Sequence, residues 1–176
     1  MKPKKNRNLI LIGYMGCGKS TIGMKSARAF EFRFLDTDEL IEKKEYCSIS
    51  TLFAEKGEDY FRNLETQILK ELLREPKGMV IATGGGLPMR KENAEILKKL
   101  GTVIYLKCSV ETLLTRLSGD TKRPLLAGEN LEEKISAMLT LRGPVYESVA
   151  DVILETNGKS FYEIICCLED ILKEKR

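Results

Sequence analysis

The chain reads Leu9-Ile10-Leu11-Ile12 and then Gly13-Tyr14-Met15-Gly16-Cys17-Gly18-Lys19-Ser20-Thr21. The apolar run is typical of a short buried strand, and the glycine-rich stretch after it ends in a lysine and two hydroxyl side chains. This order of strand, turn, lysine and hydroxyl is the structural context in which G-x-x-x-x-G-K-S binds phosphate. The segment therefore predicts a phosphate-binding loop that leads into a helix.

Each residue type in this loop has a physical role. Glycines let consecutive backbone N–H groups converge on a phosphate, and the following helix adds the positive end of its dipole. Lys19 is expected to reach the β- and γ-phosphates, and Ser20 to offer a hydroxyl oxygen to Mg²⁺. A glycine-rich turn that binds nothing is disfavoured, because Lys-Ser rarely follows a strand at this offset by chance. The predicted nucleoside-triphosphate-binding residues of the loop are Gly16, Cys17, Gly18, Lys19, Ser20 and Thr21.

Composition narrows the class of protein. A chain of 176 residues with 43% hydrophobic and 31% charged residues is expected to be one globular domain, residues 1–176. The net charge of +3 comes from 29 basic and 26 acidic residues, a balance that argues against a nucleic-acid partner. The N-terminal apolar run is too short for a signal peptide or a membrane span, so no membrane contact and a cytoplasmic location are expected.

Cysteine and histidine usage excludes several chemistries. The five cysteines show no C-x-x-C spacing and are odd in number, so neither a disulfide framework nor a zinc site is predicted. Cys17 is expected to be a small filler in the phosphate loop. The chain contains no histidine, which excludes histidine bases, triads and metal ligands.

Apolar runs and helical spacings alternate along the rest of the chain. Short strands alternating with helices predict an α/β fold with a five-stranded parallel sheet and helices on both faces. The loops at the carboxyl ends of the strands should share one rim, where ligands bind. The predicted strands are 9–12, 32–35, 78–83, 102–106 and 152–154. The predicted helices are 21–30, 38–45, 49–56, 60–73, 92–100 and 110–117, with two more after apparent capping boxes at 130–133 and 160–163.

Two aspartates follow the second predicted strand. Residues two apart on an extended segment point to the same side, so Asp36 and Asp38 would both face the rim. One carboxylate would lie near Mg²⁺ and the other near an acceptor hydroxyl. The structural alternative is that Asp38 caps the next helix and Asp36 is a turn residue.

An Arg–Glu pair and a glycine triplet are further candidates. Arg62 and Glu65 have the i, i+3 spacing of a helical ion pair, which is more often surface decoration than a site. Gly84-Gly85-Gly86 ends the third predicted strand. Three glycines cost backbone entropy, and their expected use is close approach of the backbone to a ligand, with a plain flexible turn as the alternative.

Four more cations are candidates for anion binding. Arg123 lies in a polar interruption, where a closing loop would bring it to the phosphoryl group in the transition state. The segment Arg142-Gly143-Pro144-Val145-Tyr146 ends a helical pattern, and the planar fork of Arg142 suits a carboxylate. Arg116 and Lys159 are weaker candidates for the base end of the nucleotide. A solvated loop arginine is the alternative for Arg123, and an ordinary surface cation is the alternative for Arg116 and Lys159.

Taken in this order, the motifs resemble the shikimate kinases of the P-loop, nucleoside-monophosphate-kinase-like superfamily. The resemblance runs from Leu9 to about Asn157. It implies a three-layer α/β/α fold with a mobile lid at about 118–129. The residues that carry it are Gly13–Thr21, Leu35–Asp38 followed by Ile41 and Glu42, Phe61, Arg62, Glu65, Gly84–Gly86, Arg123–Leu126 and Arg142–Tyr146.

The resemblance implies transfer of the γ-phosphoryl group of ATP to the 3-hydroxyl of shikimate, in the pathway to aromatic amino acids. It makes Asp38 the favoured base and ties Asp36 to Mg²⁺ through water. Arg62 and Arg142 would clamp the shikimate carboxylate, with Glu65 orienting Arg62.

The remaining roles follow in the same way. The backbone around Gly85 would line the shikimate pocket, Arg123 would be the lid arginine on the phosphates, and Arg116 would lie against the adenine. Lys159 stands where many relatives have an arginine near the adenine, and a lysine cannot stack or fork as an arginine does.

Two alternatives stay open at this point. A kinase for another hydroxy acid or for a nucleoside monophosphate would share most of these residues. A nucleotide-dependent switch is disfavoured, because the chain has no N-K-x-D motif for reading guanine and the aspartates and glycines would be idle. The expected ligands are ATP, shikimate and Mg²⁺, and the protein is expected to be a monomer.

Overall fold

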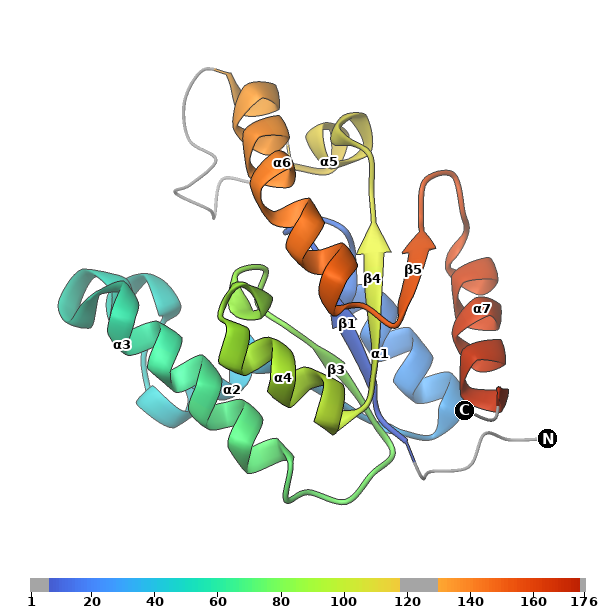
Figure 1. Cartoon of the computed structure of the whole chain (residues 1–176), viewed down its shortest axis with the longest axis horizontal. Coiled ribbons are helices and arrows are strands. Elements are labelled where there is room, and N and C mark those ends of the chain that lie inside the picture. Colours follow the sequence, from blue (N-terminus) through green and yellow to red (C-terminus); the bar gives the residue numbers. More distant parts are fainter. Residues whose placement is uncertain (1–6, 118–129, 175–176) are drawn as a thin grey trace.

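The computed structural model describes residues 7–117 and 130–174, which build one five-stranded parallel sheet in the order β2-β3-β1-β4-β5 (Figure 1). The strands are β1 (Leu9–Ile12), β2 (Arg33–Asp36), β3 (Met79–Ala82), β4 (Thr102–Lys107) and β5 (Val152–Glu155). The helices are α1 (Lys19–Phe30), α2 (Thr37–Glu45), α3 (Ile49–Leu72), the 3₁₀ turn η1 (Leu87–Met89), α4 (Lys91–Leu100), α5 (Val110–Leu117), α6 (Leu131–Val149) and α7 (Phe161–Lys173).

Burial explains why the central strands read as continuous apolar runs. Every residue of β1 and β3 is buried, as expected for strands covered on both faces, whereas β2 and β5 at the edges are partly exposed. All pairings are parallel, with Ile10 opposite both Ile81 and Val103. The five predicted strands are confirmed to within one or two residues at their ends, and their carboxyl ends meet at one rim.

Helices cover both faces of the sheet, so the predicted α/β/α layering is confirmed. Helix α1 packs on β1, β2 and β3 and contacts α7, whereas α4 and α6 pack on β4 (Figure 1). The two groups lie on opposite faces because right-handed crossovers run outward from β1 in opposite directions. The strand order reverses beside β1, which is the position where open α/β sheets bind ligands.

Two predicted helices are joined in α3. The helix runs from Ile49 to Leu72, but Gly57 has φ 79° and ψ 173°, which is not helical. The break falls between the predicted helices 49–56 and 60–73. It separates a first segment from the long second segment that carries Arg62 and Glu65.

Two predictions about α6 are wrong. Asn130 does not form a capping box, because its left-handed backbone (φ 71°, ψ 41°) replaces the extended N-cap conformation and its side chain makes no cap bond. The segment 142–146 also does not end the helix, which continues through Gly143 and Pro144 to Val149. The capping box at Ser160 and Glu163 is confirmed.

Within the two described ranges, no helix has both the length and the apolar character needed to cross a membrane. The predicted lid at 118–129 lies outside the described residues.

A buried asparagine ties together the amino ends of the strands. The fully buried Asn8 side chain donates to the carbonyl of Leu100 at 2.9 Å and accepts from the backbone N–H groups of Gly78 and Met79 at 3.0 and 3.1 Å. One side chain thus satisfies three buried backbone groups next to β1, β3 and β4. This latch lies at the end of the sheet opposite the loops that carry the candidate site.

We expect Asn8→Ala to lower the free energy of unfolding by about 2 kcal/mol, because three hydrogen bonds of a fully buried side chain are lost. The loss is moderated because the Gly78 N–H keeps its bond to the Arg7 carbonyl and the Leu100 carbonyl keeps its bond from Lys77. Urea denaturation measures this change. Ser148→Ala, which removes an exposed hydroxyl bonded to the Val145 carbonyl at 2.9 Å, is the control and should change stability by less than about 0.5 kcal/mol. Equal stability of Asn8→Ala and the unmodified protein would contradict the latch.

Candidate active site

The glycine-rich loop lies between β1 and α1, as predicted, and forms the N-terminus of the helix. Gly18 is the N-cap of α1 with φ 94°, a conformation that favours glycine. The ammonium of Lys19 donates to the carbonyls of Gly13 and Tyr14, at 2.9 Å each. The loop therefore presents a lysine and the positive end of a helix at the carboxyl end of the central strand.

Ser20 and Asp36 meet beside this loop. The Ser20 hydroxyl donates to Oδ2 of Asp36 at 2.6 Å, so the two residues predicted to serve a metal ion are brought together. Asp36 is also the N-cap of α2, because its Oδ1 accepts from the backbone N–H of Asp38 at 3.0 Å. The reading in which Asp38 is the cap is wrong.

Asp38 lies in the first turn of α2 and not on an extended segment, so the strand-alternation argument for it is wrong. Its position near the glycine triplet has another cause. A Cβ built on Gly84 would lie 2.6 Å from Oδ1 of Asp38 and 3.1 Å from Oε1 of Glu65. The two carboxylates therefore converge on the same side of Gly84, which has room for them only because it has no side chain.

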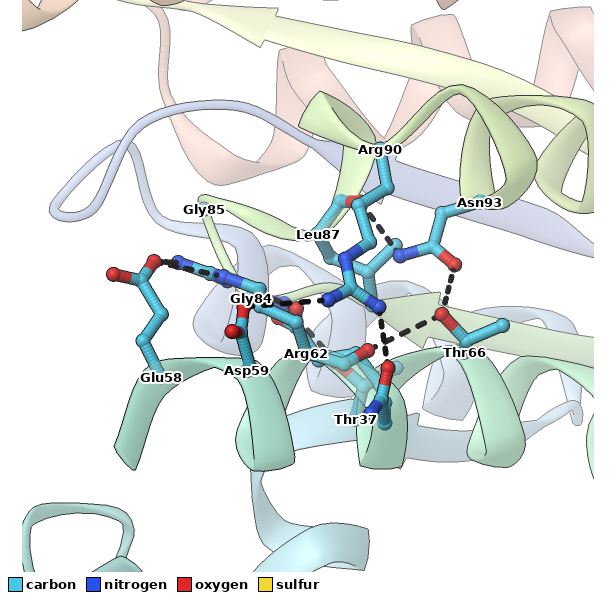
Figure 2. A network of polar contacts seen from close by, with 12 residues as sticks. Thr37, Glu58, Asp59, Arg62, Thr66, Gly84, Gly85, Leu87, Arg90 and Asn93 are labelled. Carbon is cyan, nitrogen blue, oxygen red and sulfur yellow. Dashed lines mark hydrogen bonds and ion pairs between the residues drawn. The ribbon is translucent and has the colours of Figure 1, made fainter. Parts of the chain in front are cut away.

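Arg62 is held between two glutamates (Figure 2). Its Nη1 donates to Oε2 of Glu65 at 2.8 Å, and its Nε and Nη2 donate to Oε1 of Glu58 at 3.2 and 3.0 Å. The Glu65 side chain is 1% exposed, whereas that of Glu58 is 64% exposed. A Cβ on Gly86 would lie 2.6 Å from both Nη atoms of Arg62, so Gly86 makes room for the guanidinium.

Arg142 approaches the glycine triplet from α6. A Cβ on Gly85 would lie 3.7 Å from Nη1 of Arg142, 3.5 Å from the Gly13 carbonyl oxygen and 3.6 Å from the backbone nitrogen of Met15. One turn further along α6, the Tyr146 hydroxyl donates to the Gly85 carbonyl at 2.6 Å. Gly85 therefore lies between the phosphate loop and Arg142.

Three predicted nucleotide-binding residues remain: Arg116, Lys159 and Arg123. Arg116, on α5, donates to the Gly16 carbonyl at 3.2 Å, so it lies against the phosphate loop. Lys159 is exposed in the turn after β5, where its backbone N–H donates to the Thr156 carbonyl at 3.3 Å. Arg123 lies outside the described residues. Adenine contacts by Arg116 and Lys159 stay predictions.

Sequence reasoning missed several polar residues around the site. Thr37 and Asn93 are buried: Thr37 accepts from the backbone N–H of Gly84, and Asn93 donates to the Leu87 carbonyl. Glu58 forms an ion pair with the Arg62 guanidinium. Tyr146 was part of a recognised motif, but no role was predicted for it. The i, i+4 spacing of Glu58 and Arg62 was a usable signal, whereas nothing local to Asn93 indicates its partners.

Burial dominates the electrostatics of this cluster. It raises the pKa of Glu65 to about 7, although the hydrogen bond and charge of Arg62 oppose the rise; the charge of Asp38 adds to it. Burial alone would lower the pKa of Arg62, but its bonds to Glu65 and Glu58 raise it. Arg62 therefore stays charged, and Glu65 is the residue that titrates near neutrality.

A lysine-bearing phosphate loop beside β1, with carboxylates and arginines on the adjacent strand ends, defines a P-loop kinase of small molecules. The family model for shikimate kinase matches residues 15–172. A shikimate kinase of Francisella tularensis subsp. holarctica is 39% identical over 97% of both chains. One of Thioalkalivibrio sulfidiphilus is 43% identical over 90% of this chain and 83% of its own. The structure of shikimate kinase from Acinetobacter baumannii in complex with shikimate superposes with a TM-score of 0.88 at 40% identity, covering 96% of this chain and 94% of that one. This chain belongs to the shikimate kinase family.

The raised pKa of Glu65 makes stability depend on pH. Because the folded pKa of about 7 exceeds the usual 4.5, the contribution of Glu65 is fully present below about pH 4.5 and is lost as the pH rises through 7. Glu65→Gln removes this loss. Between pH 5 and pH 8 the unfolding free energy of the unmodified protein should fall, relative to the variant, by on the order of 2–3 kcal/mol.

Urea denaturation of both proteins at several pH values tests this. The difference between the two unfolding free energies is the quantity to follow, since titrating groups common to both proteins cancel in it. A difference that stays constant from pH 5 to pH 8 would show that Glu65 does not titrate in this range.

Proposed function

We propose that this protein transfers the γ-phosphoryl group of ATP to the 3-hydroxyl of shikimate, giving shikimate 3-phosphate, a step of aromatic amino-acid biosynthesis. The observation that carries the proposal is the position of Gly85, whose missing Cβ would touch both the phosphate loop and Arg142. With Arg62 against the neighbouring Gly86, two guanidinium groups lie at the glycine triplet, whose middle residue adjoins the loop that would hold the triphosphate. A small organic anion with a carboxylate and hydroxyl groups fits this arrangement.

On the acceptor side, Arg62 and Arg142 hold the carboxylate, because a guanidinium offers parallel N–H donors to two oxygens. Glu65 keeps Arg62 in place through the 2.8 Å bond. Asp38 accepts the proton of the attacking hydroxyl. The backbone of Gly84, Gly85 and Gly86 forms the wall of the pocket.

On the donor side, Lys19 and Arg123 stabilise the charge that spreads over the transferred phosphoryl oxygens. Lys19 exchanges the Gly13 and Tyr14 carbonyls for phosphate oxygens when ATP binds. Arg116 and Lys159 lie toward the adenine. The segment 118–129 closes as a lid and excludes water, which would otherwise hydrolyse ATP.

The donor set beside the phosphate loop fits Mg²⁺. The Ser20 hydroxyl and the Asp36 carboxylate are hard oxygen ligands that meet at 2.6 Å, and Mg²⁺ is commonly held by one or two such groups together with substrate phosphates. The ion supplies positive charge to the phosphate oxygens when bound. Ser20 would bind it directly and Asp36 through water.

We expect the protein to act as a monomer. A cytoplasmic location stays a prediction.

We expect purified protein with Mg-ATP to phosphorylate shikimate, but not quinate, gluconate or AMP at comparable rates, in a coupled assay of ADP release. Lys19→Ala should fold normally and lose turnover, because the phosphate charge loses its cation. Preferred turnover of another acceptor in the panel would contradict the assignment of shikimate. Near-normal turnover by Lys19→Ala would contradict the role of the loop.

Glu58 should weaken shikimate binding, because it occupies two of the donors of Arg62 that the substrate carboxylate needs. An exposed ion pair of this kind contributes about 0.5–1 kcal/mol, so Glu58→Gln should lower the KM for shikimate roughly 2- to 5-fold and leave the KM for ATP unchanged. Steady-state kinetics with each substrate varied in turn measures both constants.

Two further variants bracket this result. Glu55→Gln, which removes the same charge from an exposed position one turn earlier, should change neither constant. Arg142→Ala should raise the KM for shikimate by about 10- to 150-fold, the value of a lost charged hydrogen bond. A rise in the KM for shikimate in Glu58→Gln would mean that Glu58 orients Arg62 instead of competing for it.

A further inference from the structure

We infer that residues 84–87, here called the glycine segment, are a frame that sets the mutual positions of Asp38, Arg62 and Arg142. Buried hydrogen bonds tie this segment to its surroundings. The residues that make them are positioning residues for the acceptor: Thr37, Asn93 with Thr66, and Tyr146. The inference rests on the proposed function, since it concerns how the acceptor's carboxylate and hydroxyl groups are met. Thr37, Thr66 and Tyr146 lie on the helices that carry the three charged groups, and Asn93, on α4, links Thr66 to the segment.

The tie to α2 is made by Thr37. The backbone N–H of Gly84 donates to Oγ1 of Thr37 at 3.0 Å, and Thr37 is fully buried. Thr37 lies between Asp36 and Asp38 in the sequence. A single buried hydroxyl thus fixes the first turn of α2, and with it Asp38, against the start of the glycine segment.

The tie to α3 is a directed chain of two hydrogen bonds (Figure 2). The Asn93 amide nitrogen donates to the Leu87 carbonyl at 2.9 Å, which places the Asn93 oxygen toward Thr66 at 2.7 Å. A carbonyl only accepts, so the direction of both bonds is determined, and Thr66 must be the donor. Thr66 follows Glu65 and lies one turn after Arg62, whose carbonyl is within 3.2 Å of the same hydroxyl.

The tie to α6 is made by Tyr146. Its hydroxyl donates to the Gly85 carbonyl at 2.6 Å, and its fully buried ring packs on Tyr105 with 5.1 Å between the ring centroids. Tyr146 lies one turn after Arg142, so a fixed Tyr146 also fixes that turn of α6. Burial raises the pKa of the Tyr146 phenol, which therefore keeps its proton and stays a donor.

The glycine segment can serve as a frame because it is itself fixed. The N–H of Leu87 donates to the Gly84 carbonyl at 3.1 Å, and Thr83 bonds to the Leu11 carbonyl with both its N–H and its hydroxyl, at 3.1 Å each. Leu11 belongs to β1, two residues before the phosphate loop. The frame therefore relates the acceptor groups to the strand that carries the loop.

The test compares Thr66→Val with Thr66→Ser. The valine variant keeps the branched shape but removes the donor to Asn93, whereas the serine variant keeps the hydroxyl. We expect Thr66→Val to raise the KM and the calorimetric Kd for shikimate roughly 3- to 10-fold with the KM for ATP unchanged, and Thr66→Ser to restore both. Ile164→Val, a buried methylene deletion on α7, controls for stability loss and should change neither substrate constant.

A second comparison separates positioning from general destabilisation. If Thr66 acts through Arg62, then Thr66→Val should have no further effect on shikimate affinity in an Arg62→Ala background. An unchanged fold-effect in that background would overturn the inference. If Thr66→Val does not fold, Tyr146→Phe decides instead, because it removes the hydroxyl that ties α6 to Gly85 and also contacts Arg142, and should weaken shikimate binding in the same range.

The outcomes distinguish this inference from the proposed function. Failure of the unmodified protein to bind or phosphorylate shikimate would contradict the function itself. Normal binding by the unmodified protein, together with unchanged shikimate affinity in both Thr66→Val and Tyr146→Phe, would overturn the frame alone. Parallel losses for shikimate and ATP would also overturn it, since a frame for the acceptor acts on one substrate.

Discussion

The absence of side chains at Gly84, Gly85 and Gly86 is the constraint on which the site depends. A Cβ at Gly84 or Gly86 would lie 2.6 Å from Asp38 or Arg62, closer than carbon and these atoms can approach. The charged groups of three helices therefore converge on bare backbone. Glycine costs conformational entropy on folding. Here Gly84 and Gly86 provide space that a side chain would fill, and the buried bonds to the segment restore the rigidity that glycine lacks.

The charges around this backbone are kept in place by unequal partners. Glu65 is buried and bonds to Arg62 out of reach of water, whereas the exposed Glu58 holds the other edge of the same guanidinium in a bond that water weakens. Burying a carboxylate without full compensation is costly, and Oε1 of Glu65 has no hydrogen-bond partner among the described residues. Burial therefore raises the pKa of Glu65 to about 7. The free-energy cost of burying charge in this cluster therefore falls on Glu65, which orients Arg62, and not on Arg62 itself.

Much of the fold was predictable because its signals are local. Buried parallel strands such as β1 and β3 read as apolar runs, and the phosphate loop is recognised from nine consecutive residues. The continuation of α6 past Arg142 was not predictable, because Gly143 and Pro144 are local signals for a helix end. Beyond these two residues the helix makes a tertiary contact: Tyr146 is buried and bonds to Gly85, which lies 61 residues away in sequence. The direction of Asp38 was also not predictable, since it comes from the first turn of α2 and not from strand alternation.

The pairing of neighbouring strands explains how the two halves of the site find each other. The phosphate loop continues β1 and the glycine segment continues β3, and these strands are paired with Leu11 opposite Ala82. The register of one strand pair therefore brings the phosphate loop and the glycine segment together, with Gly85 beside the Gly13 carbonyl. Phosphoryl transfer asks a protein mainly for positioning and charge stabilisation. A parallel sheet supplies the positioning through its backbone hydrogen bonds. The side chains at its rim then supply the charge stabilisation.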